Sequence, residues 1–543
     1  MIKKNCFSYW YEQNNKITNK KLRPYVKIMI IISLLLLVIF ALYRTGFSSN
    51  DNGLKLFLES IKNIFMPYIK SSFIEGNLFL LSLQFLWISI KVTFIGTVLG
   101  LCLALFTSMI GNIRTNNKIQ SYCIRIFILF LRSFPELFYL YLFTVSANGE
   151  LASILLISWF TWIWLHKFIS EAIEHTSFEL YVLCKRKGLS KIHILFRYLL
   201  PKIKNKIIIF ALYSYESNLR WTAIFSTLGI VGIGQLLNHS NTDLYSLHEL
   251  LIPLGVLILF VSLLEWSMYF LQKHLIYAKT YKINSNNFKS ITNKKILKTT
   301  SLWLIIVSVF IVAFCLLFTI GDPQIYWGAT NQMFKHLLNP NWSIIGKNEN
   351  IFIMLMDLFL QIYLTVILAC LLAYVNLFFT NEKTNNVYFY HFSRFISAFI
   401  RIIPTIVLFF TIGLIFKNPA AAFVVVFAIH SSTVISKQLN ESIKNISNVH
   451  IYNLKKQNKN KIIIFSQYIM PSVKKDFKTL LVLEIEKNIR NFINYGLFAA
   501  SSFGLAMQYS ERVSYSDITP YVWVSIGLIM SSNILLTWVR KNK

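Results

Sequence analysis

Two charged pairs inside long apolar segments are the residues of this chain best placed to do chemistry. Glu216 and Arg220 follow Lys206 by ten and fourteen residues, which places them roughly 15–21 Å along a helix and near the middle of a bilayer. Ionised side chains at that depth cost several kcal/mol unless they pair or face an aqueous cavity. One interpretation is a self-neutralising pair at a spacing of four residues. The other is that Arg220 lines a pathway for an anion while Glu216 holds the guanidinium in place.

The same pattern recurs about 270 residues later, in the same order as in the first copy. A shift of 270 places Glu216-Ser217-Asn218-Leu219-Arg220 on Glu486-Lys487-Asn488-Ile489-Arg490, Tyr198-Leu199-Leu200-Pro201 on Tyr468-Ile469-Met470-Pro471, and Glu171-Ala172-Ile173 on Glu441-Ser442-Ile443. A shift of 269 pairs Arg132-Ser133-Phe134-Pro135 with Arg401-Ile402-Ile403-Pro404. We interpret this as an internal repeat. The candidate pathway residues are therefore Glu216, Asn218, Arg220, Glu486, Asn488 and Arg490.

Composition indicates the environment of these residues. The chain has 543 residues, of which 55% are hydrophobic and 14% are charged, and this balance favours a membrane protein over soluble domains. The formal charge of +31 could suggest nucleic acid as a partner. However, Lys and Arg collect in alternate connections between apolar runs, as they do in cytoplasmic loops, so the charge is interpreted as membrane topology.

Apolar runs predict six membrane spans in each half. They lie near 27–43, 83–108, 126–146, 151–169, 206–233 and 250–271, and then near 301–320, 351–379, 396–416, 418–435, 477–500 and 519–539. An even number per half gives both copies the same orientation and a pathway between them. We expect an all-α polytopic membrane protein with about 12 transmembrane helices as two parallel six-helix repeats. The expected division is a first half (1–275), a cytoplasmic linker (276–300) and a second half (301–543).

The positions of the basic connections predict the sidedness. Seven connections rich in Lys and Arg fall on one side, which places both termini in the cytoplasm of a cell-membrane protein. These connections are 1–26, 109–125, 170–205, 272–300, 380–395, 436–476 and 540–543.

The connection 170–205 carries the most informative motif. Gly188 is followed after nine residues by Tyr198-Leu199-Leu200-Pro201, with Glu171-Ala172 upstream. This spacing resembles the loop through which permeases of binding-protein-dependent ABC importers couple to their ATPase, which implies a short helix that fits a groove on that partner. The chain departs from the pattern at Val182-Leu183-Cys184, where Glu-Ala-Ala would precede the glycine. The alternative is an ordinary basic amphipathic loop lying on the inner leaflet.

In the second copy, the connection 436–476, Asn458 replaces the glycine. Asn tolerates positive φ better than most residues, so the turn can survive, although we expect stronger coupling through the first copy. The coupling residues implied by the resemblance are Glu171, Ala172, Gly188, Pro201, Glu441, Asn458 and Pro471.

A second resemblance concerns the substrate. The run Tyr215–Arg220, the glycine-rich run 229–237 and Arg132-Ser133-Phe134-Pro135-Glu136-Leu137 are similar to segments of phosphonate-type ABC importer permeases. The similarity covers most of 84–240, and it covers 351–510 mainly through the repeat. Within that family the chain most resembles the fused permease of the mycoplasma high-affinity transport system. The resemblance implies uptake of a phosphorus-containing organic anion, delivered by a substrate-binding lipoprotein and driven by separate ATP-binding subunits, two of them if both loops couple.

Other chemistry finds little support in the sequence. There is no P-loop, since Gly346-Lys347 is followed by Asn348, so we expect no ATPase site in this chain. No HExxH spacing or cysteine pattern predicts a metal or another cofactor, and no catalytic set is expected. Asp357 and Glu265 lie in or beside apolar runs without a repeat partner and are assigned no role. The rival function is an ion-coupled secondary transporter with two six-helix halves, which shares the helix count.

Overall fold

The computed structural model describes residues 8–541, except 14–15, 114–115, 175, 177, 227–229, 241–245, 273–287, 322, 346–349 and 445. A two-stranded antiparallel hairpin, β1 (Ser8–Gln13) and β2 (Lys16–Leu22), precedes a helical body. The longer helices up to residue 271 are α1 (Pro24–Thr45), α3 (Leu78–Ile110), α4 (Lys118–Ser133), α5 (Glu136–Ser146), α6 (Gly149–Glu174), α9 (Leu200–Phe225) and α11 (Leu251–Leu271). Those that follow are α12 (Phe288–Leu317), α14 (Ile351–Thr380), α15 (Val387–Ile402), α16 (Thr405–Ile412), α17 (Pro419–Lys444), α21 (Lys474–Asn494) and α23 (Tyr515–Lys541).

Short helices connect the long ones. Near one end of the bundle they are α2 (Gly53–Ile64), α10 (Gly234–His239), α13 (Trp327–Leu338) and α22 (Ser502–Val513). Near the other end they are α7 (Phe178–Arg186), α8 (Lys191–Ile194), α18 (Asn448–Lys456), α19 (Lys461–Ile464) and α20 (Met470–Ser472). Short 3₁₀ segments lie at Ser246–Glu249, Trp342–Ile344, Gly413–Ile415 and Tyr495–Phe498. A short helix was expected in the connections 170–205 and 436–476, where α7 and α18 lie; the other short elements were not predicted.

The described residues include seven helices that are long and apolar enough to cross a membrane, and up to nine spans if each of two bent pairs is counted as one. The bent pairs are α4 with α5, at 86°, and α15 with the segment Thr405–Ile415, at 92°. The part of α12 whose side chains the structure describes includes a shorter apolar helix, Leu304–Leu317, while α9 and α21 reach spanning length but carry several charged residues. The all-helical membrane fold is confirmed, and the count of 12 spans stays a prediction. The expected linker 276–300 lies outside the described residues up to 287, and its remainder forms the first turns of α12.

Two helix pairs form the centres of the bundle. α3 packs along α6, and α14 packs along α17. Small residues allow the first contact, since a Cβ on Gly100 would lie 2.5 Å from the Ser158 carbonyl oxygen, and one on Gly96 would lie 2.8 Å from the Ile157 Cβ. Close approach of this kind is a common basis of helix association in membranes, where water does not drive apolar faces together.

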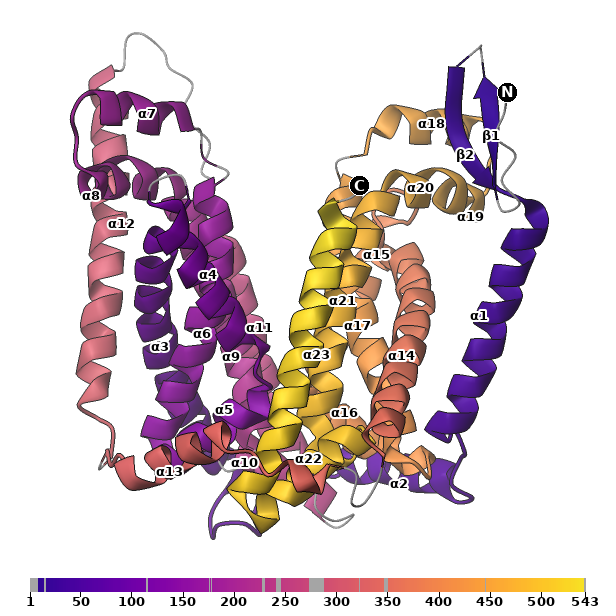
Figure 1. Cartoon of the computed structure of the whole chain (residues 1–543), viewed down its shortest axis with the longest axis horizontal. Coiled ribbons are helices and arrows are strands. Elements are labelled where there is room, and N and C mark those ends of the chain that lie inside the picture. The colour runs from indigo at the N-terminus through magenta and orange to yellow at the C-terminus, as the bar shows by residue number, and fades with distance from the viewer. Residues whose placement is uncertain are drawn as a thin grey trace.

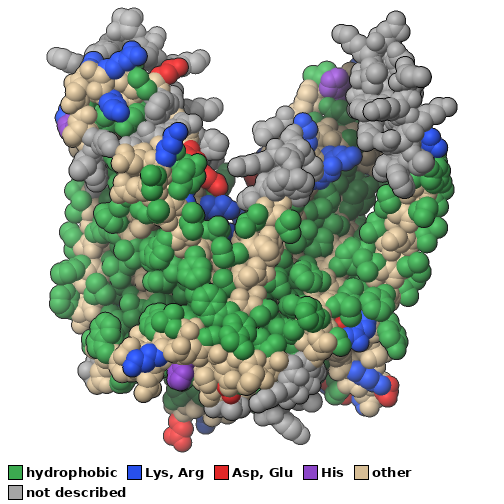
Figure 2. All heavy atoms as spheres, viewed as in Figure 1, with side chains coloured by type: hydrophobic (Ala, Val, Ile, Leu, Met, Phe, Trp, Pro, Cys, Tyr) green, Lys and Arg blue, Asp and Glu red, His purple; other side chains and the backbone are tan. Residues whose placement is uncertain are grey.

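Figure 1 shows two groups of helices, one around α3, α6 and α9 and the other around α14, α17 and α21. The groups separate toward the end that carries α7 and α18, and Figure 2 shows the surface hollowed there. Green apolar side chains cover the middle of the molecule, whereas the charged side chains visible in this view gather toward its two ends. This distribution matches a bilayer around the middle and water at both ends.

The helix that begins each half of the sequence packs against the opposite group of helices. α1 contacts α14, and α12 contacts α3. The Arg44 guanidinium donates two hydrogen bonds of 3.0 Å to the Asp357 carboxylate, joining α1 to α14. At the other end of these helices, two isolated β-bridges also join the two halves of the sequence, one between Ser49 and Phe416 and one between Ala147 and Ile325. The two groups are therefore interlocked rather than merely adjacent.

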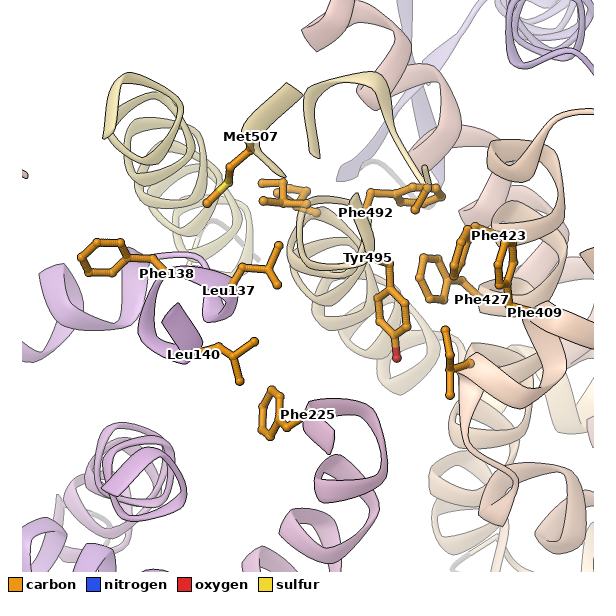
Figure 3. Close-up of a cluster of buried hydrophobic side chains, with 14 of the residues drawn as sticks. Leu137, Phe138, Leu140, Phe225, Phe409, Phe423, Phe427, Phe492, Tyr495 and Met507 are labelled. Carbon is orange, nitrogen blue, oxygen red and sulfur yellow. The ribbon is translucent and has the colours of Figure 1, made fainter. Parts of the chain in front are cut away.

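An apolar cluster lies where the groups meet. Figure 3 shows side chains of α5 and α9 near side chains of α16, α17 and α21. Its labelled members are Leu137, Phe138, Leu140, Phe225, Phe409, Phe423, Phe427, Phe492, Tyr495 and Met507. The buried aromatic rings contribute large apolar area, so this cluster holds the groups together beside the charged residues described next.

Candidate functional site

Two broken helices bring arginines to the interface between the groups. α4 ends before Pro135, and α15 ends before Pro404, because proline lacks the donor that a continuing helix requires. The preceding residues, Phe134 and Ile403, are extended, as expected before proline. In both copies an arginine, Arg132 or Arg401, occupies the last turn before the break.

In the first copy the arginine is locked by the opposite group. A nitrogen of Arg132 lies 2.7 Å from the Glu486 carboxylate on α21, with only 8% and 7% of the two side chains exposed. Arg490 lies 3.9 Å from the same carboxylate and donates a 2.7 Å hydrogen bond to the Arg132 carbonyl oxygen. The Trp164 ring covers the cluster, with its centroid 4.3 Å from the Arg132 guanidinium carbon.

In the second copy the corresponding arginine faces a cavity of about 180 Å³. Three cationic side chains line it: Arg220 from α9, Arg401 from α15 and Lys487 from α21. The other lining residues are Ser217, Trp221, Ile402, Ile403, Pro404, Thr405, His430, Val434, Asn491 and Tyr495, so no carboxylate is among the lining residues that the structure describes.

Carboxylates stand behind these cations rather than in the cavity. Glu216 lies 3.0 Å from Arg220, and Glu265 of α11 lies 3.0 Å from Arg401. Glu265 also lies 3.8 Å from Lys437, and Glu484 lies 3.6 Å from Lys487. Each cation of the cavity therefore has a counter-charge that makes its burial tolerable.

The predicted pathway residues divide into two sets. Arg220 lines the cavity, and its pairing with Glu216 confirms the contact expected at a spacing of four residues. Arg490 and Glu486 lie instead with Arg132 and Trp164 in the buried ion-pair cluster described above, which we call the locked cluster.

The two asparagines take no part in lining the cavity. Asn218 donates hydrogen bonds to the hydroxyls of Thr97 and Thr161 and so ties α9 to α3 and α6. Asn488 is fully buried, and its amide has no hydrogen-bond partner among the described residues.

Sequence reasoning missed Arg401, Lys487, Lys437 and Glu265 as partners of this site. Arg401 was matched to Arg132 only as part of the repeat, and Lys487 only as part of the Glu-x-Asn-x-Arg core. Glu265 was set aside because it has no repeat equivalent. The missed signal was the charge itself, because an ionised residue within an apolar run demands a partner even when the repeat supplies none.

The two predicted coupling turns have the same backbone. Gly188 has φ +75°, and Asn458 has φ +51°. The Gly188 and Leu189 amides donate to the carbonyls of Lys185 and Cys184, and the amides of Asn458 and Lys459 donate to Lys455 and Leu454. This is the pattern of a Schellman helix end. The expectation that asparagine preserves the turn is confirmed.

A five-residue π-helical stretch follows each turn, at Leu195–Leu199 and at Phe465–Ile469. Tyr181 of α7 packs on Leu195 and Leu199, and Ile451 of α18 packs on Phe465 and Ile469. Burial in this contact raises the pKa of the Tyr181 phenol above its ordinary value. Both short helices are thus fixed to the base of the following long helix.

The other coupling residues flank these helices. Glu171 is exposed and Ala172 is buried near the end of α6, while exposed Glu441 pairs with Lys444 at 3.1 Å in α17. Pro201 and Pro471 are the second residues of α9 and α20, which continue directly from the two π-helical stretches.

Exposed apolar side chains point away from the bundle on both short helices. Leu183 is 55% exposed, Tyr452 is 57% exposed and Val449 is 65% exposed. Basic residues at the helix ends, Lys185 with Arg186 and Lys455 with Lys456, surround them. Among the described residues no group of three or more His, Cys, Asp or Glu could hold a metal ion.

The structure describes a helical membrane protein that has a cavity lined by cationic side chains and two short helices with exposed apolar side chains. Residues 96–281 match the protein family described as "Binding-protein-dependent transport system inner membrane component". This range contains α6 to α9, and with them the first predicted coupling turn and Arg220. The chain is a membrane-embedded permease component of an ABC transporter, a class in which the ATPase is a separate subunit.

Two curated relatives extend the similarity over most of the chain. The chain is 25% identical to the "ABC transport system permease protein p69" of Mycoplasma pneumoniae over 508 residues, which cover 91% of this chain and 90% of the relative. It is 27% identical to the protein of the same name in Mycoplasma genitalium over 545 residues, covering 96% and 95%. No solved structure matches the chain.

Proposed function

We propose that this permease imports a phosphorus-containing organic anion, such as a phosphonate or a phosphate ester, and that two separate ATP-binding subunits drive it. A substrate-binding lipoprotein delivers the anion on the outer side. The observation that carries the proposal is the repetition of the α7 turn in α18, at the same end of the molecule. Two equivalent docking elements fit two equivalent partners.

The proposed architecture is a pseudo-symmetric pair of halves, 1–275 and 301–543, fused in one chain. The matching π stretches, bent pairs and positive-φ turns recur at offsets of 269 to 270 residues. The contacts of α3 with α6 and α9 correspond to those of α14 with α17 and α21. Both Asn458 and Gly188 support a complete turn, so we assign an ATPase subunit to each loop, with contacts around 179–191 and 449–461.

The hollow in Figure 2 opens toward the proposed ATPase side. On this proposal the termini and the coupling helices face the cytoplasm of the cell membrane, and the hollow is the inner access to the pathway. When the ATPase subunits close, α7 and α18 approach each other and the two interlocked groups follow as rigid bodies. Access then shifts to the outer side, where the binding protein releases its cargo.

The anionic nature of the cargo is supported by Arg220 and the other cavity cations. Guanidinium groups match phosphate-like oxygens with paired hydrogen bonds. Glu216 and Glu265 hold these groups at about 3.0 Å, so the anion competes with an existing partner and can leave again. Binding of moderate strength suits a transport pathway, because the anion has to leave the site again.

A co-purification experiment tests the coupling assignment. Tyr452→Glu places a charge on the exposed apolar face of α18, and we expect loss of the ATPase subunit from the purified complex because that face has to be desolvated on docking. The matched control is Tyr388→Glu, since Tyr388 is 90% exposed on α15 outside the coupling loop. If Tyr452→Glu and the double variant with Leu183→Glu retain the subunit as the control does, the assignment is wrong.

A further inference from the structure

The two halves differ at the positions that decide whether an anion can reach the arginine. At the offset of 270, Val434 stands where the first half has Trp164. At the offset of 269, Thr405 stands where it has Glu136. Trp164 and Glu136 belong to the locked cluster, with Trp164 over Arg132 and Glu136 bonded to Asn494 of α21. Val434 and Thr405 instead line the cavity beside Arg401.

Val434 and Thr405 are smaller than Trp164 and Glu136 and leave room for the cavity. Two of the side chains that line it have nitrogen atoms without a hydrogen-bond partner among the described residues. Arg401 Nε and His430 Nδ1 are buried and have no hydrogen-bond partner among the described residues. A buried donor without a partner is costly, and a ligand that accepts from it relieves that cost. Both side chains line the cavity, together with the Arg220 guanidinium and the Lys487 ammonium.

We propose that the chain has one oxyanion site rather than two, formed by Arg220, Arg401, Lys487 and His430 and made available by Val434. The inference rests on the proposed function and specifies where that function binds its cargo. The equivalent place in the first half is filled by Trp164 and serves to hold the halves together. The duplicated halves thus divide two tasks between them.

The chemistry and the size of the site define the ligand group. Four cations, Arg220, Arg401, Lys437 and Lys487, face three carboxylates, Glu216, Glu265 and Glu484, which leaves one net positive charge around the cavity. A cavity of roughly 150 Å³ holds a molecule of benzene size, so about 180 Å³ accommodates a phosphate or phosphonate group with a small substituent. A lipid phosphate has the same chemistry but brings two acyl chains, and the experiment separates the two sources.

Binding to the full-length protein in phosphatidylcholine nanodiscs tests the site. The probe is ³²P-labelled inorganic phosphate, with methylphosphonate as the competitor. We expect saturable binding that methylphosphonate displaces and that Arg401→Gln weakens roughly 10- to 100-fold, which corresponds to one lost charge-assisted hydrogen bond. Lys444→Gln, in an exposed pair on α17, is the control and should bind as the wild type does.

A second variant keeps all the charges and removes only the space. Val434→Trp places in the second half the residue that the first half has at position 164, and we expect loss of phosphate binding while the protein remains monodisperse. Unchanged binding in this variant overturns the proposal, as does the absence of saturable binding in the wild type. Displacement by phosphatidic acid in the nanodisc, without displacement by methylphosphonate, assigns the site to lipid and also overturns it.

The two proposals can fail separately. If the ATPase subunit co-purifies but phosphate does not bind, the permease function stands and the site is wrong. If phosphate binds and Val434→Trp abolishes binding while the ATPase subunit never co-purifies, the site stands and the coupling assignment fails.

Discussion

Removing the carboxylate of Glu486 should destabilise the interface between the two halves more than any exposed charge substitution. Glu486→Gln leaves the Arg132 guanidinium, now 2.7 Å from a carboxylate, and Arg490, now 3.9 Å from it, without that counter-charge. Both arginines are at least nine-tenths buried. Breaking a buried pair on one side costs about 3–5 kcal/mol. By contrast, Glu441→Gln breaks a pair whose side chains are 64% and 40% exposed, and such a pair contributes about 0–1 kcal/mol.

The assay is the free energy of unfolding in mixed micelles by detergent titration, followed by far-UV circular dichroism. Glu486→Gln, Arg132→Gln and the double variant form a double-mutant cycle. Because the double variant removes both charges of the pair, its loss should be smaller than the sum of the single losses by about 1–3 kcal/mol. Additive losses, or a Glu486→Gln protein as stable as Glu441→Gln, would refute the assignment of a cross-half lock.

Two further predictions concern glycine positions. Gly188→Val should weaken ATPase co-purification and cost about 1–2 kcal/mol of stability because Gly188 has φ +75°, whereas Asn458→Gly, which suits the same turn, should be neutral in both measurements. Equal behaviour of the two variants would contradict the shared turn. Gly100→Leu should lower the yield of monodisperse protein severalfold in size-exclusion chromatography, because a Cβ there meets α6 at 2.5 Å, while Gly255→Leu, with nothing within 4 Å of its Cβ, should not. Comparable yields would remove the close α3–α6 contact from the explanation of the fold.

Helix positions were predictable from the sequence because apolar length is a strong and local signal. The predicted span 351–379 coincides with α14 at Ile351–Thr380, and the predicted span 250–271 coincides with α11 at Leu251–Leu271. The expected spans 126–146 and 396–416 are bent pairs, each broken immediately before a proline. Proline makes a break predictable, but the angle depends on tertiary packing that periodicity does not report.

The coupling turns were predictable for a similar reason. Gly188 and Asn458 are residue types that tolerate positive φ, and both adopt it. The requirement for positive φ concerns one residue and its nearest neighbours in the chain, so the local sequence is enough to predict the turn.

The charge partners of the cavity were not predictable to the same degree. Arg220 was identified from its depth in an apolar run, but its neighbour Arg401 comes from a helix 181 positions away in the sequence. The repeat suggested that Arg490 would mirror Arg220, but Arg490 lies near Trp164 in the cluster around Arg132, whereas Arg220 lines the cavity together with Val434. A role for Arg490 in the pathway stays a prediction. A repeat predicts backbone position, while side-chain volume decides which copy keeps a cavity.

The most direct test of ATP-driven anion import is uptake into proteoliposomes that contain the full-length chain, its ATP-binding subunits and its substrate-binding protein. The cargo is labelled methylphosphonate, and ATP is supplied on the side of α7 and α18. We predict uptake that requires hydrolysable ATP, persists after ionophores collapse the ion gradients, and falls at least tenfold in Arg220→Gln despite normal assembly. Uptake that continues without ATP and stops with ionophores would contradict the proposal and indicate an ion-coupled secondary transporter.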